Sequence, residues 1–407
     1  MAHERSTDPI IATLQEVVAI PSVNPGLPGG TDGERGMADY LTRFFADAGI
    51  ACEEWDALPG RPNVVATLPG RDPTRAVLFE CHMDTATAEG MTIEPFEPVV
   101  KDGKVFGRGS ADTKAGGVAM LHAMLRIARS GEPPPVSVMY AGAVDEEYRM
   151  RGAAALADAL PACGTRVVAA VVAEPTELRI VRAHKGIIRA VIDVHGTAAH
   201  SSKPHLGASS IGAAARLITA FDEEVGAGFA ALDDGITGVP THNVGTIHGG
   251  LQVNFVPAEC RMELDRRILP SEDFDAVLDP YRRIAARAAE DAGVTIDVTE
   301  DLSIEPMETP ADAPIVAGAA AAVRAVTGTA SVEGEPYGTD AAKLSAAGIP
   351  SIVLGPGSID QAHAAVEWIE CAQVRQAVEV YHRIMLDAAT CVAHDDQEPR
   401  GHGRQLE

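Results

Sequence analysis

Long apolar runs and paired cysteines are both missing from this sequence. No apolar stretch approaches the ~20 residues that a membrane-spanning helix needs, so we expect no membrane partner. The six cysteines are scattered and form no CxxC pair, which argues against a cysteine zinc site or a disulfide framework. Polar residues interrupt the stretch 1–21, so we expect no signal peptide. These absences predict a cytoplasmic protein with reduced thiols.

Basic residues are scarce relative to acidic ones. The chain has 33 lysines and arginines against 58 aspartates and glutamates, and its formal net charge is −25. A surface this acidic repels phosphate backbones, so nucleic acid is not an expected partner. Apolar residues make up 46% and charged residues 22%, which is ordinary for a globular protein. At 407 residues, the chain exceeds what one core usually supports, so two domains are expected.

Buried parallel strands are indicated by apolar runs that end in polar residues. Such runs occupy 76–81, 136–143 and 167–173, and a fourth, 351–354, ends in a glycine-rich stretch. Continuous apolar runs of this length are typical of strands covered on both faces. Helical patterns lie between them, notably at 115–128 and 152–160. This alternation predicts an α/β domain with a doubly wound, mostly parallel sheet.

The middle of the chain has a different pattern. Residues 187–194, 243–247 and 258–265 alternate like half-exposed strands, and residues 209–221 and 274–292 have helical patterns. The resulting β-α-β-β-α order predicts a small antiparallel sheet with helices on one face. We therefore expect a catalytic domain formed by residues 1–185 and 301–407. Residues 186–300 would form an inserted α+β lid and dimerisation domain.

Acidic residues and a histidine follow the predicted parallel strands, at the sheet edge where ligands of open α/β sheets collect. They are His82, Asp84, Asp145, Glu146, Glu147 and Glu174. Clustered carboxylates repel one another at low dielectric, so such a cluster favours a bound cation. On an extended segment Asp84 faces the same side as His82, so it can orient the imidazole for metal binding. The alternative is a capped strand end with a satisfied histidine.

Three further elements add candidate ligands. Asp112 lies in a glycine-rich loop before a helix, where it would bridge two ions. One alternative is a helix N-cap, where aspartate is common. A phosphate-binding loop is the other alternative, but the Walker spacing is absent. In the run 145–147, one carboxylate would bind metal while its neighbour acts as general base. The alternative there is a solvated acidic turn. His363 follows the glycine-rich stretch after the fourth strand and is another candidate ligand.

The order and spacing of these motifs resemble those of the dinuclear zinc amidohydrolases and exopeptidases. This family includes acetylornithine deacetylase, succinyl-diaminopimelate desuccinylase, aminoacylase and glutamate carboxypeptidase. The resemblance extends from His82 to His363 and through the lid. Several stretches are most similar to acetylornithine deacetylase: Glu174-Pro-Thr, Val181-Arg-Ala-His-Lys-Gly186, His200-Ser-Ser, Gly245-Thr-Ile-His-Gly-Gly250 and Leu354-Gly-Pro-Gly-Ser-Ile-Asp-Gln-Ala-His363.

The resemblance implies a pair of divalent metal ions, with zinc expected and cobalt or manganese as alternatives. The implied ligands are His82 and Glu174 for one ion, Glu147 and His363 for the other, and Asp112 for both. Glu146 would be the general base, and Asp84 would assist at the catalytic site. The bond from Asp112 to Thr113 is expected to be cis, as in related enzymes.

The lid would contribute residues as well. The resemblance implies that His200 reaches the active site of a partner subunit, so a homodimer through the lid is expected. Asn254 and Arg267 would grip the substrate's carboxylate, and Gly338 and Thr339 would contact the substrate.

One position departs from the family pattern: Val366 stands where a polar Asn or Asp usually precedes Glu367. A valine side chain cannot form the hydrogen bond that the usual polar residue would make near the metal ligands, but the candidate ligand His363 itself is present.

The expected reaction is hydrolysis of the amide bond of an N-acyl amino acid. N2-acetylornithine is the leading substrate, which would place the enzyme in arginine biosynthesis. A succinyl-diaminopimelate desuccinylase or a glutamate-type carboxypeptidase or dipeptidase is the alternative. A mononuclear aminopeptidase or a non-catalytic relative would lack Asp112, Glu146 or another of these residues, and all are present. The acyl group and the amino-acid side chain are not specified by the sequence.

Overall fold

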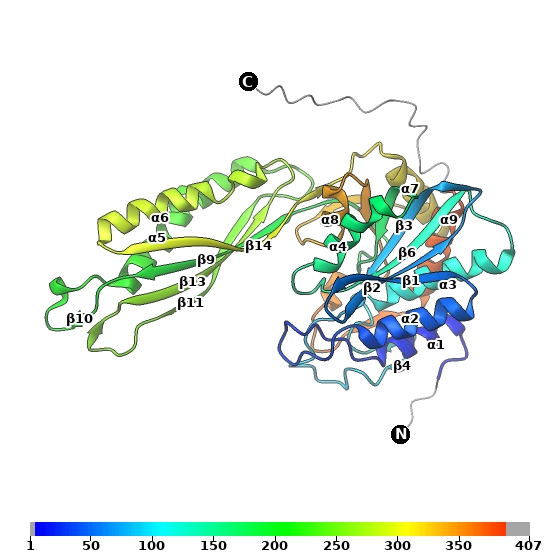
Figure 1. The fold of residues 1–407 in the computed structure, drawn as a ribbon, viewed down its shortest axis with the longest axis horizontal. Coiled ribbons are helices and arrows are strands. Elements are labelled where there is room, and N and C mark those ends of the chain that lie inside the picture. Colours follow the sequence, from blue (N-terminus) through cyan, green and yellow to red (C-terminus); the bar gives the residue numbers. More distant parts are fainter. Residues whose placement is uncertain (1–4, 388–407) are drawn as a thin grey trace. The chain divides into compact units, whose positions relative to one another are not determined.

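The chain divides into two compact units in the computed structural model, which describes residues 5–387. The first unit takes the residues up to Ile180, Pro310–Val332 and those from Ile349 on, and the second takes Val181–Thr309 and Glu333–Gly348. Figure 1 labels their helices and strands. None of the described helices is long and apolar enough to cross a membrane. Five cysteines are free thiols, and Cys391 lies outside the described residues.

The first unit contributes six strands to a mostly parallel sheet, in the order β1-β2-β6-β3-β7-β17. The last four run parallel to one another, and β2 and β1 form an antiparallel edge. The strands are β1 (Ala51–Leu58), β2 (Arg61–Leu68), β3 (Asp72–His82), β6 (Val136–Ala143), β7 (Arg166–Val172) and β17 (Ser351–Val353). All eight residues of β6 are buried, as expected for a strand covered on both faces. The predicted fold class is confirmed.

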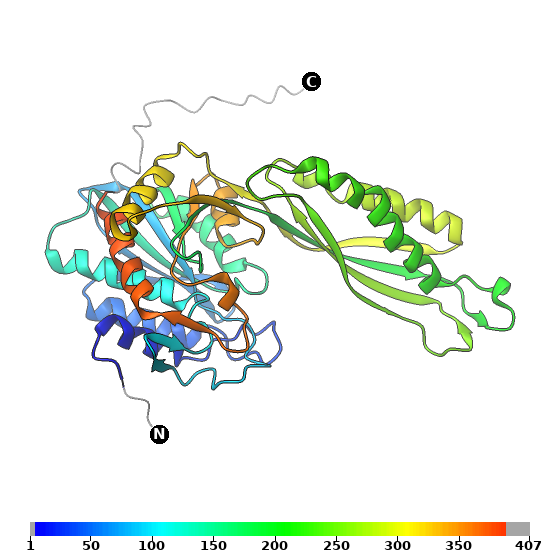
Figure 2. The ribbon, with the colours of Figure 1, turned by 180° about the vertical axis from the view of Figure 1, so that it is seen from behind.

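Helices cover both faces of this sheet. They are α1 (Pro9–Val18), α2 (Arg35–Asp47), α3 (Lys114–Ser130), α4 (Arg151–Ala159), α7 (Pro314–Thr327) and α9 (Cys371–Leu386). In Figure 1 helix α4 lies in front of the sheet, whereas in Figure 2, seen from behind, α3 and α9 lie in front of it. Five of the helices share one apolar core with the strands, α4 being the exception. A separate small sheet pairs β4 (Val99–Lys101), β5 (Lys104–Phe106) and β18 (Trp368–Glu370).

The second unit contains an antiparallel sheet of four strands in the order β11-β13-β9-β14. The strands are β9 (Gly186–His195), β11 (Thr241–Gly249), β13 (Glu259–Ile268) and β14 (Thr295–Ile304). Two helices, α5 (Ser210–Glu224) and α6 (Asp279–Ala292), share a second core with the sheet. Strand β14 is absent from the prediction because acidic residues interrupt its apolar alternation, and only two of its ten residues are buried. A short ladder joins β10 (Ala199–His200) to β12 (Phe255–Val256).

The segment 333–348 also packs with the second unit, although the sequence analysis placed it in the catalytic domain. Its first strand, β16 (Val332–Glu335), pairs with β8 (Ile180–His184), which pairs in turn with β15 (Met307–Glu308). The segment continues into the short helix α8 (Ala341–Ala346). Strands β8 and β16 are about 150 residues apart in the chain, and such a pairing leaves no local sequence pattern. Periodicity therefore predicts neither the domain boundaries nor the pairing partner of this segment.

The first helix begins with an aspartate cap that also joins the two ends of the first unit. One carboxylate oxygen of Asp8 accepts the N–H of Ile10 at 2.9 Å, and the other accepts Nε of Arg375 at 2.6 Å. Burial acts to raise the pKa of Asp8, but the bonds from Arg375 and Ile10 outweigh it and the pKa is lowered. Asp8 therefore stabilises the fold above the unfolded pKa of ~3.9, and this contribution disappears as the pH falls through the folded pKa.

We predict that Asp8→Ala lowers the free energy of unfolding at pH 7 by about 1 kcal/mol, the usual cost of losing an N-cap. Asp8→Asn keeps a capping oxygen and loses only the charge, so it is expected to lose less. Urea denaturation at pH 7 and again below pH 4 measures both effects. Equal stability of the wild type and Asp8→Ala at pH 7, or a difference that grows in acid, would contradict the assignment.

Candidate metal centre

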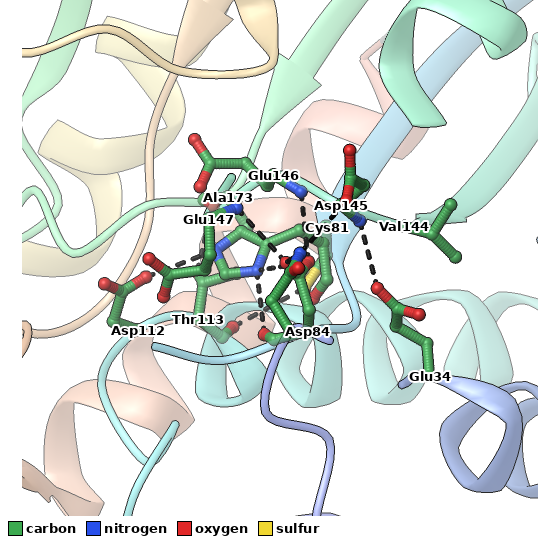
Figure 3. A network of polar contacts seen from close by, with 12 residues as sticks. Glu34, Cys81, Asp84, Asp112, Thr113, Val144, Asp145, Glu146, Glu147 and Ala173 are labelled. Carbon is green, nitrogen blue, oxygen red and sulfur yellow. Dashed lines mark hydrogen bonds and ion pairs between the residues drawn. The ribbon is translucent and has the colours of Figure 1, made fainter. Parts of the chain in front are cut away.

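Five predicted ligands lie together at the carboxyl end of the parallel sheet in the first unit. The ligand atoms form two groups, and within each group they lie within 4.8 Å of one another: His82, Asp112 and Glu174, and then Asp112, Glu147 and His363. Topology explains the convergence, because β3, β6 and β7 run parallel and are followed by His82, Glu147 and Glu174. Figure 3 shows the carboxylates of Asp112 and Glu147 beside each other.

Asp112 belongs to both groups. Its Oδ1 lies 3.2 Å from Nε2 of His82, and its Oδ2 lies 3.5 Å from Nε2 of His363. The same nitrogen of His82 is 3.8 Å from Glu174, and that of His363 is 2.9 Å from Glu147. One carboxylate that turns its two oxygens toward two histidines has the arrangement of a bridging ligand. The peptide bond from Asp112 to Thr113 is cis, as predicted.

The carboxylates of this cluster repel one another in a buried setting. Burial and the charge of Asp112 raise the pKa of Glu174 well above its usual range, and the same two causes raise the pKa of Glu147. Burial acts against the charged form of His82, but its acidic neighbours, Asp112 first, raise its pKa well above the usual value. A hydrogen bond with Glu147 raises the pKa of His363 to about 9. Each of these raised pKa values indicates a site that favours bound positive charge.

The donor set fits divalent metal ions. One oxygen of Glu147, Oε1, is buried without a hydrogen-bond partner, and such an orphaned atom is costly unless something else binds it. Two imidazoles and three carboxylates are the nitrogen and oxygen donors that zinc accepts. His363 adopts a left-handed backbone with φ 59°, a conformation that costs free energy and is found mainly at functional sites.

Asp84 supports both His82 and the acidic turn. Nδ1 of His82 lies 3.0 Å from the backbone carbonyl oxygen of Asp84 and 3.6 Å from its carboxylate. The carboxylate itself accepts the N–H groups of Glu146 at 3.1 Å and Glu147 at 3.2 Å. Figure 3 shows Asp84 beside the turn that carries Glu146. Asp84 therefore holds the backbone of the predicted general base as well as one side of the imidazole.

Asn24 is a buried residue of this site that the sequence analysis missed. Its side-chain amide donates to Asp84 at 2.7 Å and to Asp145 at 3.2 Å. Asp145 also accepts Nε of Arg151 at 2.5 Å and a guanidinium N–H of Arg61 at 3.1 Å. The amide lies between two buried carboxylates that would otherwise face each other. A lone asparagine in a turn carries no signal of such a role.

The remaining predicted residues lie in the second unit, at the two ends of its sheet. His200 pairs with Phe255 in the β10–β12 ladder, and the carbonyl of Asn254 accepts the N–H of Ser201 at 3.0 Å. Arg267 lies near the far end of β13, ten residues long, which spans about 30 Å. One chain therefore brings His200 and Asn254 together but holds both apart from Arg267.

Gly338 and Thr339 lie at the Arg267 end of the sheet. A Cβ at Gly338 would lie 3.2 Å from Cδ1 of Ile187, the residue that pairs with Arg267 on β13. The Thr339 hydroxyl lies 3.2 Å from Nε2 of His184 and accepts the N–H of Ala341 at 3.2 Å. Burial lowers the pKa of His184 to about 4. Nδ1 of His184 lies 3.0 Å from the backbone carbonyl of Lys185 and donates to it, which leaves Nε2 to accept from Thr339. The side chain of Thr339 is thus engaged within the protein.

Comparison with known proteins agrees with this geometry. A family model described as peptidase family M20/M25/M40 matches residues 78–387. The chain belongs to this family. It is therefore an enzyme, a metal-dependent hydrolase of the M20 type, whose candidate ligands form the two groups above.

Individual relatives within the M20/M25/M40 family carry two different names. An acetylornithine deacetylase from Myxococcus xanthus is 31% identical over 88% of this chain and 92% of its own length. A succinyl-diaminopimelate desuccinylase from Cereibacter sphaeroides is 28% identical over 93% of this chain and 98% of its own length. The crystal structure of aminopeptidase PepT from Bacillus cereus has a TM-score of 0.78 at 23% identity and covers 94% of this chain and 99% of that one.

We predict that Asp112→Asn weakens zinc binding at both positions, because one side chain faces both histidines. The loss should exceed the ~10–100-fold that altered outer partners of a metal site typically cause. Isothermal titration of the metal-free protein with zinc measures it, and the exposed Asp102 offers a matched control as Asp102→Asn. An Asp112→Asn protein that binds two ions as tightly as the wild type would rule out a bridging role.

Proposed function

We propose that this M20 hydrolase removes the acyl group from N-acyl amino acids, with N2-acetylornithine as its principal substrate. Hydrolysis is supported by one observation above all, which is that Asp112 belongs to both ligand groups. Identities of 31% and 28% do not separate a deacetylase from a desuccinylase. The preference for acetylornithine is supported by the motifs at 181–186 and 354–363, and the desuccinylase is the second candidate.

Two divalent cations, with zinc proposed, would be held by His82, Glu174, Asp112, Glu147 and His363. When bound, they would supply the Lewis acidity that lowers the pKa of water and polarises the amide carbonyl. Glu146 would take the proton from the attacking water and return it to the leaving amine. Its backbone is fixed for this role by Asp84, which accepts its N–H at 3.1 Å. Removal of a general base typically slows turnover by ~10²–10⁴-fold.

Residues of the lid would bind the substrate. We propose that the guanidinium of Arg267 grips the α-carboxylate, since its donors match carboxylate geometry. Nε of Arg267 already donates to Asp265 at 2.7 Å, which orients the guanidinium. Gly338 lies close to the strand that pairs with Arg267, which supports a contact of its backbone with the same substrate group. The imidazole of His200 would stabilise the developing oxyanion, and the amide of Asn254 would join Arg267 at the carboxylate, both from a second subunit.

The second subunit is proposed because of the surface around His200. Leu251 and Val253 are each 98% exposed, and Phe255 and Leu206 are 45% and 64% exposed. Exposed apolar side chains gathered in one place usually mark an interaction site. A two-fold pairing of lids would cover these side chains and bring His200 to the active site of the partner.

The substrate assignment is tested by hydrolysis of matched N-acyl substrates with the zinc-loaded enzyme. N2-acetylornithine, N-acetylglutamate, N-succinyl-diaminopimelate and an alanyl dipeptide separate the acyl group from the side chain and from peptidase activity. We expect the highest kcat/KM for N2-acetylornithine. A higher value for the succinyl substrate or the dipeptide would replace acetylornithine with the corresponding alternative.

The role of the second subunit is tested by mixing two inactive variants. Glu146→Ala lacks the base, and His200→Ala lacks the residue donated to the partner. In a mixed dimer one site has its own Glu146 and receives His200 from the other chain, so we expect up to a quarter of wild-type activity after subunit exchange. Exchange shown by mass spectrometry with no recovery of activity would contradict the proposal.

A further inference from the structure

The carboxylate of Glu367 lies at the centre of the loop that carries Asp112. It is fully buried, at 0% exposure. Its Oε2 accepts Nη1 of Arg108 at 2.8 Å and the N–H of Gly109 at 3.0 Å. Its Oε1 accepts the N–H of Ala111 at 2.8 Å and the N–H of Asp112 at 3.0 Å. One side chain thus binds four donors, all from five consecutive residues.

Strand pairing explains why Glu367 reaches this loop. β18 pairs with β5 so that Trp368 lies opposite Phe106. The ladder continues for one step, because the N–H of Gly107 donates to the backbone carbonyl of Glu367 at 3.1 Å. After that step the loop leaves the strand and its N–H groups lose their ladder partners. The side chain of Glu367 then takes over as acceptor, which satisfies donors that would be costly to bury unpaired.

The same short segment also delivers a predicted ligand. His363 lies four positions before Glu367, on the loop that follows β17. The segment 363–370 therefore supplies one histidine directly and fixes the backbone of the shared aspartate through a carboxylate. Val366, at the position that departs from the family pattern, is 37% exposed and takes no part in these contacts. Two of the three candidate ligands in one group, Asp112 and His363, are in this way tied to a single segment.

We propose that Glu367 is a positioning residue of the metal centre: it holds the backbone of Asp112 so that both carboxylate oxygens face the two histidines. This inference rests on the metal role of Asp112 proposed above. Asp112 is anchored at its own N–H and at the N–H of Ala111. Loss of those bonds would let the loop relax and would displace the one carboxylate that both ion positions share. Outer partners of this kind typically change metal affinity by ~10–100-fold.

A simpler role is that Glu367 only neutralises Arg108, whose side chain is 3% exposed. The two roles differ in which contacts matter. If neutralisation is the whole role, removal of both charges in Arg108→Gln with Glu367→Gln restores metal binding. If the bonds to Ala111 and Asp112 are what matters, the double variant remains defective, because a glutamine offers one acceptor oxygen where the glutamate offers two.

The experiment measures zinc affinity by isothermal titration and the visible spectrum of the cobalt-loaded protein. Glu367→Gln is expected to bind zinc ~10–100-fold more weakly and to show a changed cobalt spectrum, in the direction that Asp112→Asn changes it. Glu370→Gln is the matched control, because Glu370 lies three positions on with a side chain 49% exposed. It should bind zinc like the wild type. Circular dichroism establishes that each variant is folded.

Several results would overturn the inference. They are wild-type zinc affinity in Glu367→Gln, full recovery in the double variant with Arg108→Gln, and an equal loss in Glu370→Gln. Should Glu367→Gln not fold, Glu367→Asp keeps the charge but is one methylene too short to reach all four donors, and wild-type affinity there would overturn it as well. A wild-type protein that takes up no zinc or cobalt would instead refute the proposed function.

Discussion

The mutual repulsion of three buried carboxylates is the constraint on which the rest of this structure depends. Asp112, Glu147 and Glu174 lie within a few ångströms of two histidines. Together with burial, the charge of Asp112 raises the pKa of both Glu147 and Glu174. At low dielectric such a cluster is unfavourable without compensating positive charge. Two of the three residues are fixed through their backbones, because Asp84 accepts the N–H of Glu147 and Glu367 accepts the N–H of Asp112.

The supporting contacts divide into two sets that meet at the metal centre. On one side Asp84, Asn24 and Asp145 hold the turn that follows β6, and with it Glu146 and Glu147. On the other side Glu367 holds the loop before α3 through backbone N–H groups. In both sets an acidic side chain binds backbone donors next to a functional carboxylate. Oriented backbone N–H groups therefore stabilise negative charge close to the candidate metal ligands.

Much of this was accessible from the sequence. The parallel strands 76–81, 136–143 and 167–173 are continuous apolar runs, and the motifs that follow them keep the family order, so five candidate ligands could be named before their geometry was known. The edge strand β1 and the lid strand β14 were missed because their acidic residues hide the strand pattern.

Contacts between distant segments could not be predicted from periodicity. The pairing of residues 333–348 with the second unit, the amide of Asn24 and the four bonds of Glu367 all join residues far apart in the chain. Asn254 and Arg267 were expected to grip one carboxylate, yet they lie toward opposite ends of β13, so one chain holds them apart.

The central claim is that Asp112 lies between two metal ions. Anomalous diffraction at the zinc edge, from crystals of the zinc-loaded protein, tests it most directly. The account predicts two anomalous peaks roughly 3.5–4 Å apart, one beside His82 and Glu174, the other beside Glu147 and His363, with an oxygen of Asp112 at each. A single peak, or two peaks with Asp112 turned away from either, would contradict it.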